Sequence, residues 1–85
     1  RKADDARLTV YPNPSPDGRF LVGTGDEPWL WFEVYEASGR LIQRRSGSGP
    51  MNEMDLSGHP SGTYVLRCIT EGSSRSVLLQ KVATP

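Results

Sequence analysis

Residues 29–45 read WLWFEVYEASGRLIQRR. Apolar side chains alternate along Trp29–Ala37, and a period of two is typical of a β-strand with one buried face. Ser38-Gly39 then predicts a tight turn into a second strand at Arg40–Arg45, so we expect an antiparallel hairpin. Its long strand would direct one set of side chains to one face, Leu30, Phe32 and Val34, and a second set to the other, Trp29, Trp31, Glu33 and Tyr35.

Short apolar runs of the same kind recur along the whole 85-residue chain, separated by turns rich in Gly and Pro. No window shows the i, i+3, i+4, i+7 pattern of an amphipathic helix. Runs spaced about 8–12 residues apart predict an all-β fold, an antiparallel sandwich or barrel. With the hairpin, we expect seven strands, the other five at Leu8–Tyr11, Arg19–Thr24, Met51–Leu56, Thr63–Thr70 and Ser76–Val82.

Tyr64 lies near the start of the predicted penultimate strand. In Greek-key sandwiches a tyrosine at this place buries its ring and sends its hydroxyl back to the backbone a few residues upstream. We therefore expect Tyr64, Leu66 and Cys68 to point inward. The residues between and after them, Val65, Arg67 and Ile69, would point outward or toward a neighbouring surface.

The charge balance excludes several classes of partner. Ten basic and ten acidic residues give a net charge of zero and a pI near 6.8, whereas a nucleic-acid binder normally shows a basic excess. We interpret Arg40, Arg44 and Arg45 as a solvated strand face. No apolar run approaches the roughly 20 residues that span a bilayer, so we expect neither nucleic-acid binding nor direct membrane insertion.

The reactive side chains are too few for catalysis or metal binding. His59 is the only histidine, and its neighbours Asp55, Ser57 and Ser61 are adjacent in a loop without any sign of converging as a triad. Cys68 is the only cysteine and is expected as a buried, inert thiol. We therefore predict no enzyme activity, no cofactor and no metal site.

Four segments in series resemble the C-terminal sorting domain of type IX secretion substrates in Bacteroidota. They are Leu8–Pro14 with Gly18, the hairpin Val34–Ile42, the loop and strand Asp55–Arg67, and Lys81 near the end. Each segment alone is ordinary turn-and-strand chemistry. Together they follow the family's order and spacing over residues 8–82.

This resemblance implies a single immunoglobulin-like β-sandwich with Greek-key connections, which acts as an address. Residues 1–7 would be a tether, 8–82 the sorting domain and 83–85 a tail. The expected partners are an N-terminal cargo domain, the type IX translocon and a surface sortase that cuts N-terminal to the domain. The protein would pass through the periplasm and reach the cell surface or be secreted, with the domain a monomer.

The resemblance also singles out motif residues that either fix turns or contact the translocon. Lys81 is the expected contact, because a solvent-facing lysine at the end of an edge strand is not needed for packing, although such a lysine also discourages strand aggregation. The full set is Pro12, Asn13, Pro14, Gly18, Gly39, Gly62, Tyr64 and Lys81.

The alternative is a carbohydrate- or protein-binding module that uses an aromatic strand face. Trp29, Trp31 and Tyr35 share one face of the predicted long strand. If that face is exposed, it is a platform for a sugar ring or an apolar partner surface.

Overall fold

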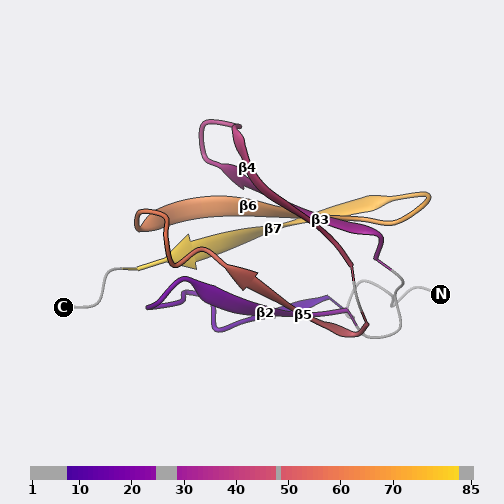
Figure 1. Cartoon of the computed structure of the whole chain (residues 1–85), viewed down its shortest axis with the longest axis horizontal. Helices are drawn as coiled ribbons and strands as arrows, with labels where there is room; N and C mark the ends of the chain where they lie inside the picture. The colour runs from indigo at the N-terminus through magenta and orange to yellow at the C-terminus, as the bar shows by residue number, and fades with distance from the viewer. Residues whose placement is uncertain (1–7, 25–28, 48, 83–85) are drawn as a thin grey trace.

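The computed structural model describes residues 8–24, 29–47 and 49–82. This part of the chain is built from strands (Figure 1). The strands are β1 (Thr9–Tyr11), β2 (Arg19–Gly23), β3 (Trp31–Glu36), β4 (Leu41–Ser46), β5 (Met51–Asp55), β6 (Gly62–Ile69) and β7 (Ser74–Lys81). All seven predicted strands are present, with boundaries shifted by one or two residues. The predicted tether and tail, 1–7 and 83–85, lie outside the described residues.

The strands form two antiparallel sheets that face each other as layers of a sandwich (Figure 1). The three-stranded sheet has the order β1-β2-β5, and the four-stranded sheet has the order β4-β3-β6-β7. The chain changes layer after β2, β4 and β5, so that β6 returns to pair with β3. The prediction of a seven-stranded antiparallel sandwich is therefore confirmed, and the barrel is excluded by the two separate sheets.

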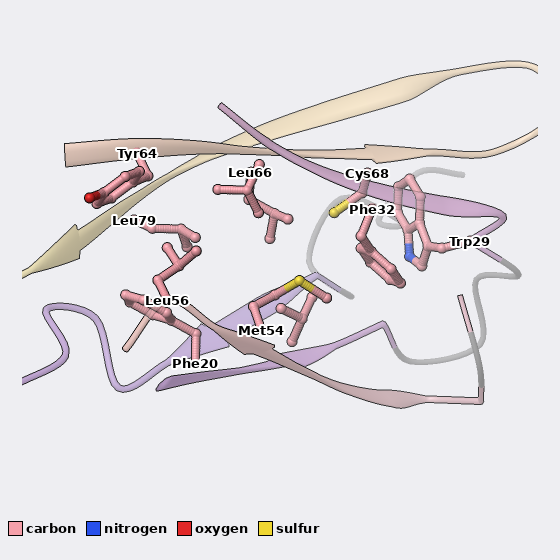
Figure 2. Close-up of a cluster of buried hydrophobic side chains, with 11 residues drawn as sticks. Phe20, Trp29, Phe32, Met54, Leu56, Tyr64, Leu66, Cys68 and Leu79 are labelled. Atoms are coloured by element: carbon pink, nitrogen blue, oxygen red, sulfur yellow. The ribbon is translucent and has the colours of Figure 1, made fainter. Parts of the chain in front are cut away.

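The core fills the space between the layers and takes side chains from both (Figure 2). Alternate residues of β6 follow the predicted pattern, since Tyr64, Leu66 and Cys68 are buried between more exposed neighbours. The core is completed by residues from the other strands and their ends, Phe20, Val22, Trp29, Phe32, Val34, Met54, Leu56 and Leu79.

Trp29 belongs to this core, which corrects the expectation that it shares a face with Trp31. Its side chain is 8% exposed, whereas Leu30 is 45% exposed. The alternation fails because β3 begins only at Trp31. Ahead of the strand, the backbone of Leu30 bonds to Ile69 and Gly47. The indole of Trp29 lies beside Phe32 and Cys68 (Figure 2).

The predicted hairpin between β3 and β4 is confirmed. The N–H of Gly39 donates to the carbonyl of Glu36 (2.8 Å), and the N–H of Glu36 donates to the carbonyl of Arg40 (2.9 Å). Gly39 has a φ of +97°, a conformation that side-chain-bearing residues rarely adopt. Arg40 also pairs with the Glu36 carboxylate at 2.8 Å.

Candidate functional site

All the motif residues except Gly39 lie at the end of the sandwich where β7 finishes. The loop that follows β1 runs along the free edge of β7. There the side chain of Asn13 makes hydrogen bonds that a neighbouring strand would otherwise make. The side-chain amide of Asn13 donates to the carbonyl of Leu78 (2.8 Å) and accepts the N–H of Gln80 (3.0 Å). Both flanking bonds, Tyr11-Pro12 and Asn13-Pro14, are cis. One side chain thus satisfies two backbone groups of an otherwise open strand edge.

Ser15 continues this pairing through its backbone. Its N–H donates to the carbonyl of Gln80 (2.8 Å), and its carbonyl accepts the N–H of Val82 (3.0 Å), in a parallel bridge centred on Lys81. The loop and the end of β7 are therefore joined by a short run of hydrogen bonds. Nothing in the sequence singles out Ser15, because serine is common in turns that contain proline.

The side chain of Ser15 is fully buried and organises the turn that leads into β2. Its hydroxyl accepts the N–H of Gly18 (3.1 Å) and lies within hydrogen-bond distance of the Arg19 carbonyl (2.9 Å) and Asp17 Oδ1 (3.0 Å). The N–H of Arg19 donates to the same carboxylate. These bonds, that of Arg19 first, hold the pKa of Asp17 below its usual value.

Gly18 allows this turn to approach the segment that follows β5. Its φ is +82°, and a Cβ at this position would lie 2.9 Å from the carbonyl carbon of Leu56 and 3.0 Å from Cδ of Lys81. The carbonyl of Gly18 also accepts the N–H of Leu56 (2.8 Å). A side chain at position 18 would force these segments apart.

Lys81 fills the centre of this end and is not the solvent-facing residue expected from the sequence. Its ammonium donates to the carbonyls of Leu56 (3.2 Å), Ser57 (3.1 Å) and His59. The residue is half-buried. The expectation is wrong because the Leu56–His59 turn folds over the end of β7. The lysine therefore donates hydrogen bonds to three backbone carbonyls of this turn.

Tyr64 anchors the other side of the same turn. Its ring is 5% exposed, and its hydroxyl donates to the carbonyl of Pro60, four residues upstream. The ring of His59 stands edge-on to it, with centroids 6.4 Å apart. The predicted tyrosine corner is confirmed, and the turn is held from one side by Tyr64 and from the other by Lys81.

The remaining motif residues contribute less to these contacts. Pro12, Pro14 and Gly62 are exposed at the same end, and Gly62 is the residue opposite Lys81 in the β6–β7 ladder. Gly39 is exposed in the β3–β4 turn. The structure therefore brings Asn13, Gly18, Tyr64 and Lys81 together with Ser15, whereas Gly39 serves its own hairpin. A role for any of them in recognition stays a prediction.

The aromatic platform of the alternative function does not form. Trp29 is in the core, and the guanidinium of Arg44 lies 4.1 Å from the centroid of the Trp31 ring. The hydroxyl of Tyr35 donates to Glu33 Oε1 (2.6 Å), which raises the pKa of this phenol. Glu33 also pairs with Arg44 at 3.4 Å. One arginine thus covers the exposed indole, and the tyrosine is held by a carboxylate.

The reactive groups of the described residues do not form a catalytic or metal site. No group of three or more His, Cys, Asp or Glu is placed to hold a metal ion within residues 8–24, 29–47 and 49–82. Burial raises the pKa of the Cys68 thiol to about 12. Asp55 Oδ1 accepts the N–H of Ser57 (2.9 Å). Within the described residues, no helical segment has the length and hydrophobicity that spanning a bilayer requires.

Fold and site together define a small β-sandwich in which the loop after β1 is hydrogen-bonded to the end of β7. We call this end of the sandwich, with Asn13, Ser15, Gly18, Tyr64 and Lys81, the ordered end. The sequence model of the family described as "secretion system C-terminal sorting domain" matches residues 9–82. The chain belongs to this family, the C-terminal sorting domains of type IX secretion substrates, and the resemblance noted from the motifs is confirmed. The family is non-enzymatic, in agreement with the prediction of no enzyme activity. A search of curated proteins found no match.

Proposed function

We propose that the folded domain is the export address of a cargo protein fused to its N-terminal side. The translocon would bind the folded domain, and a surface sortase would then cut N-terminal to it and leave the cargo attached to the cell surface. Membership of the sorting-domain family supports export and an interaction with the secretion machinery. The passage through the periplasm, the cleavage and the attachment are parts of the proposal.

The observation that carries this proposal is the ordered end of the sandwich. Asn13, Gly18, Tyr64 and Lys81 come from three segments of the chain, and their contacts hold one turn and one strand end in a defined shape. Pro12, Pro14 and Gly62 are exposed beside them. A domain without a catalytic centre is recognised by its surface, and this end is the part whose shape depends on the motif residues.

The ordered end would form only when the whole domain has folded. The Pro12–Gly18 loop and the end of β7 are joined by hydrogen bonds from the side chain of Asn13. Its partners are Leu78, which lies 65 positions later in the sequence, and Gln80, which lies 67 positions later. A chain that lacked either segment would leave the other without its partners. We infer that the translocon distinguishes folded from incomplete domains at this end.

Export of a reporter tests the function. Residues 1–85 are fused to the C-terminus of a periplasmic reporter in a host that carries the type IX system. We expect the reporter outside the outer membrane, and the same reporter fused to an unrelated β-sandwich of similar size to stay in the periplasm. A reporter that remains periplasmic with a folded sorting domain attached would contradict the proposal.

A further inference from the structure

Most of the edge strands of this sandwich are protected from pairing with a further strand, and β7 is the exception. An open edge exposes unpaired N–H and C=O groups to which another strand can bind. In β5 the carbonyls of Glu53 and Asp55 accept hydrogen bonds from Arg45 (2.6 Å) and Gln43 (3.2 Å). β4 carries Arg44 and Arg45, and charged side chains discourage pairing. β1 has only three residues.

β7 is protected over only part of its length. Gln80 and the carbonyl of Leu78 bond to Asn13 and Ser15, which shows that these residues direct their backbone groups to the free edge. The β6–β7 ladder is regular, so every second residue of β7 faces the same way. Ser76 therefore presents its N–H and C=O at this edge. No other segment of the described chain bonds to them.

On the outer face of the sheet, one side chain beside this open edge is apolar: Leu78 follows Ser74 and Ser76. Leu78 is 60% exposed, more than any other large apolar side chain in the described part of the chain. The strand register places Val65 next to Leu78, then Tyr35 and then Leu41, in one row across the sheet. A strand added at Ser76 and Leu78 would extend this row and cover its most exposed member.

We propose that an extended segment of the secretion machinery pairs with β7 between Ser74 and Leu78. The added strand would bond to the backbone of Ser76 and place an apolar side chain against Leu78. Main-chain bonds supply affinity and alternate side chains supply selectivity in this mode of recognition. The proposal rests on the proposed export function, which brings the domain to the machinery.

A second copy of the chain fits this edge less well than a foreign strand. In an antiparallel pair centred on Ser76, the two copies of Arg75 would lie diagonally across the new ladder on one face, where like charges repel. The carbonyl of Leu78, which would accept a bond from Ser74 of the other copy, is already bonded to Asn13. A foreign strand without a basic residue beside Arg75 avoids this repulsion, and one whose pairing ends opposite Ser76 does not need the carbonyl of Leu78.

Two pairs of variants in the 1–85 reporter fusion test the pairing. Ser76→Pro removes the N–H that faces the free edge, where proline is tolerated, and Ser76→Ala keeps it. Leu78→Lys adds a charge at the edge, and Leu21→Lys adds one on the outer face of the opposite sheet, where Leu21 is 37% exposed. Thermal melts verify that each variant is folded. We expect Ser76→Pro and Leu78→Lys to lower export about tenfold, with the two controls close to wild type.

A photoreactive residue at position 76, with position 21 as the control, identifies the partner in exporting cells. We expect position 76 to cross-link to a translocon component and position 21 not to do so. Normal export by folded Ser76→Pro and Leu78→Lys would overturn the proposal, as would a cross-link at position 76 to a second copy alone. If Ser76→Pro does not fold, Leu78→Lys and the cross-link decide. Failure of the wild-type fusion to be exported would instead refute the underlying export function.

Discussion

Lys81 and Arg44 are both cations of the four-stranded sheet, but they meet their partners in different surroundings. The ammonium of Lys81 bonds to three backbone carbonyls of one turn, and the side chain lies between segments far apart in the sequence. Arg44 lies on the outer face, half exposed, between Trp31 and Glu33. Exposed ion pairs contribute about 0–1 kcal/mol, whereas hydrogen bonds to charged groups contribute about 1.5–3 kcal/mol. The ordered end should therefore govern stability, and the outer face should not.

The largest effect is expected at Tyr64, on the ordered end. Tyr64→Ala removes a buried ring and should lower the free energy of unfolding by about 3–5 kcal/mol, as much as a domain of this size is expected to have. Tyr64→Phe removes only the bond to Pro60 and should cost about 0.5–1.5 kcal/mol. Urea titration followed by circular dichroism measures both. Equal stability of wild type and Tyr64→Ala would refute the importance of this corner.

Gly18→Ala should have the next largest effect and lower the free energy of unfolding by about 2–4 kcal/mol. The alanine would have a strained φ, and its Cβ would clash with Leu56. Gly39→Ala is the matched control. That glycine also has a positive φ, but nothing lies within 4 Å of its would-be Cβ, so only the backbone strain of about 1–3 kcal/mol applies. The difference between the two melting temperatures measures the close approach alone. A larger loss for Gly39→Ala would contradict this account of the ordered end.

Lys81→Met should cost about 1.5–3 kcal/mol, since it keeps the aliphatic stem and removes three hydrogen bonds. Thermal melts and reporter export are measured on the same variant. A stable variant that is poorly exported would make Lys81 a contact for the translocon. A melting temperature equal to that of the wild type would show that the turn does not need the ammonium.

Acid should weaken the ordered end through Asp17. Its folded-state pKa is lowered, chiefly by the N–H of Arg19, so its stabilising effect is present above the unfolded pKa near 3.9. That effect is lost as the pH falls through the folded-state pKa. Between pH 5 and pH 2, wild type should lose more stability than Asp17→Asn. Parallel melting curves for the two proteins across this range would contradict the assignment.

The smallest effect is expected on the outer face. Arg44→Ala removes the contacts with Trp31 and Glu33 and should change stability by about 0–1 kcal/mol. High salt should reduce even this difference. A loss comparable to that of Lys81→Met, measured by the same urea titration, would remove the contrast between the two cations.

Local signals explain why the strands were predictable. Alternation in β6 assigned Tyr64, Leu66 and Cys68 to the core, and Ser38-Gly39 marked the hairpin turn. Each of these signals lies within a few residues of the feature that it predicts. Trp29 was misassigned because alternation holds only inside a strand, and β3 starts two residues later.

Local sequence signals were enough to predict the number of strands, their approximate limits, the tyrosine corner and the motif series of the family. The positions of three other residues follow from the packing of the folded chain: Lys81 lies under the Leu56–His59 turn, Ser15 is buried, and Ser76 lies at an open edge. Periodicity and turn preference depend on neighbours in the chain. Asn13 instead covers backbone groups of Leu78 and Gln80, which lie 65 and 67 positions later in the sequence. These hydrogen bonds exist only after the two sheets have packed.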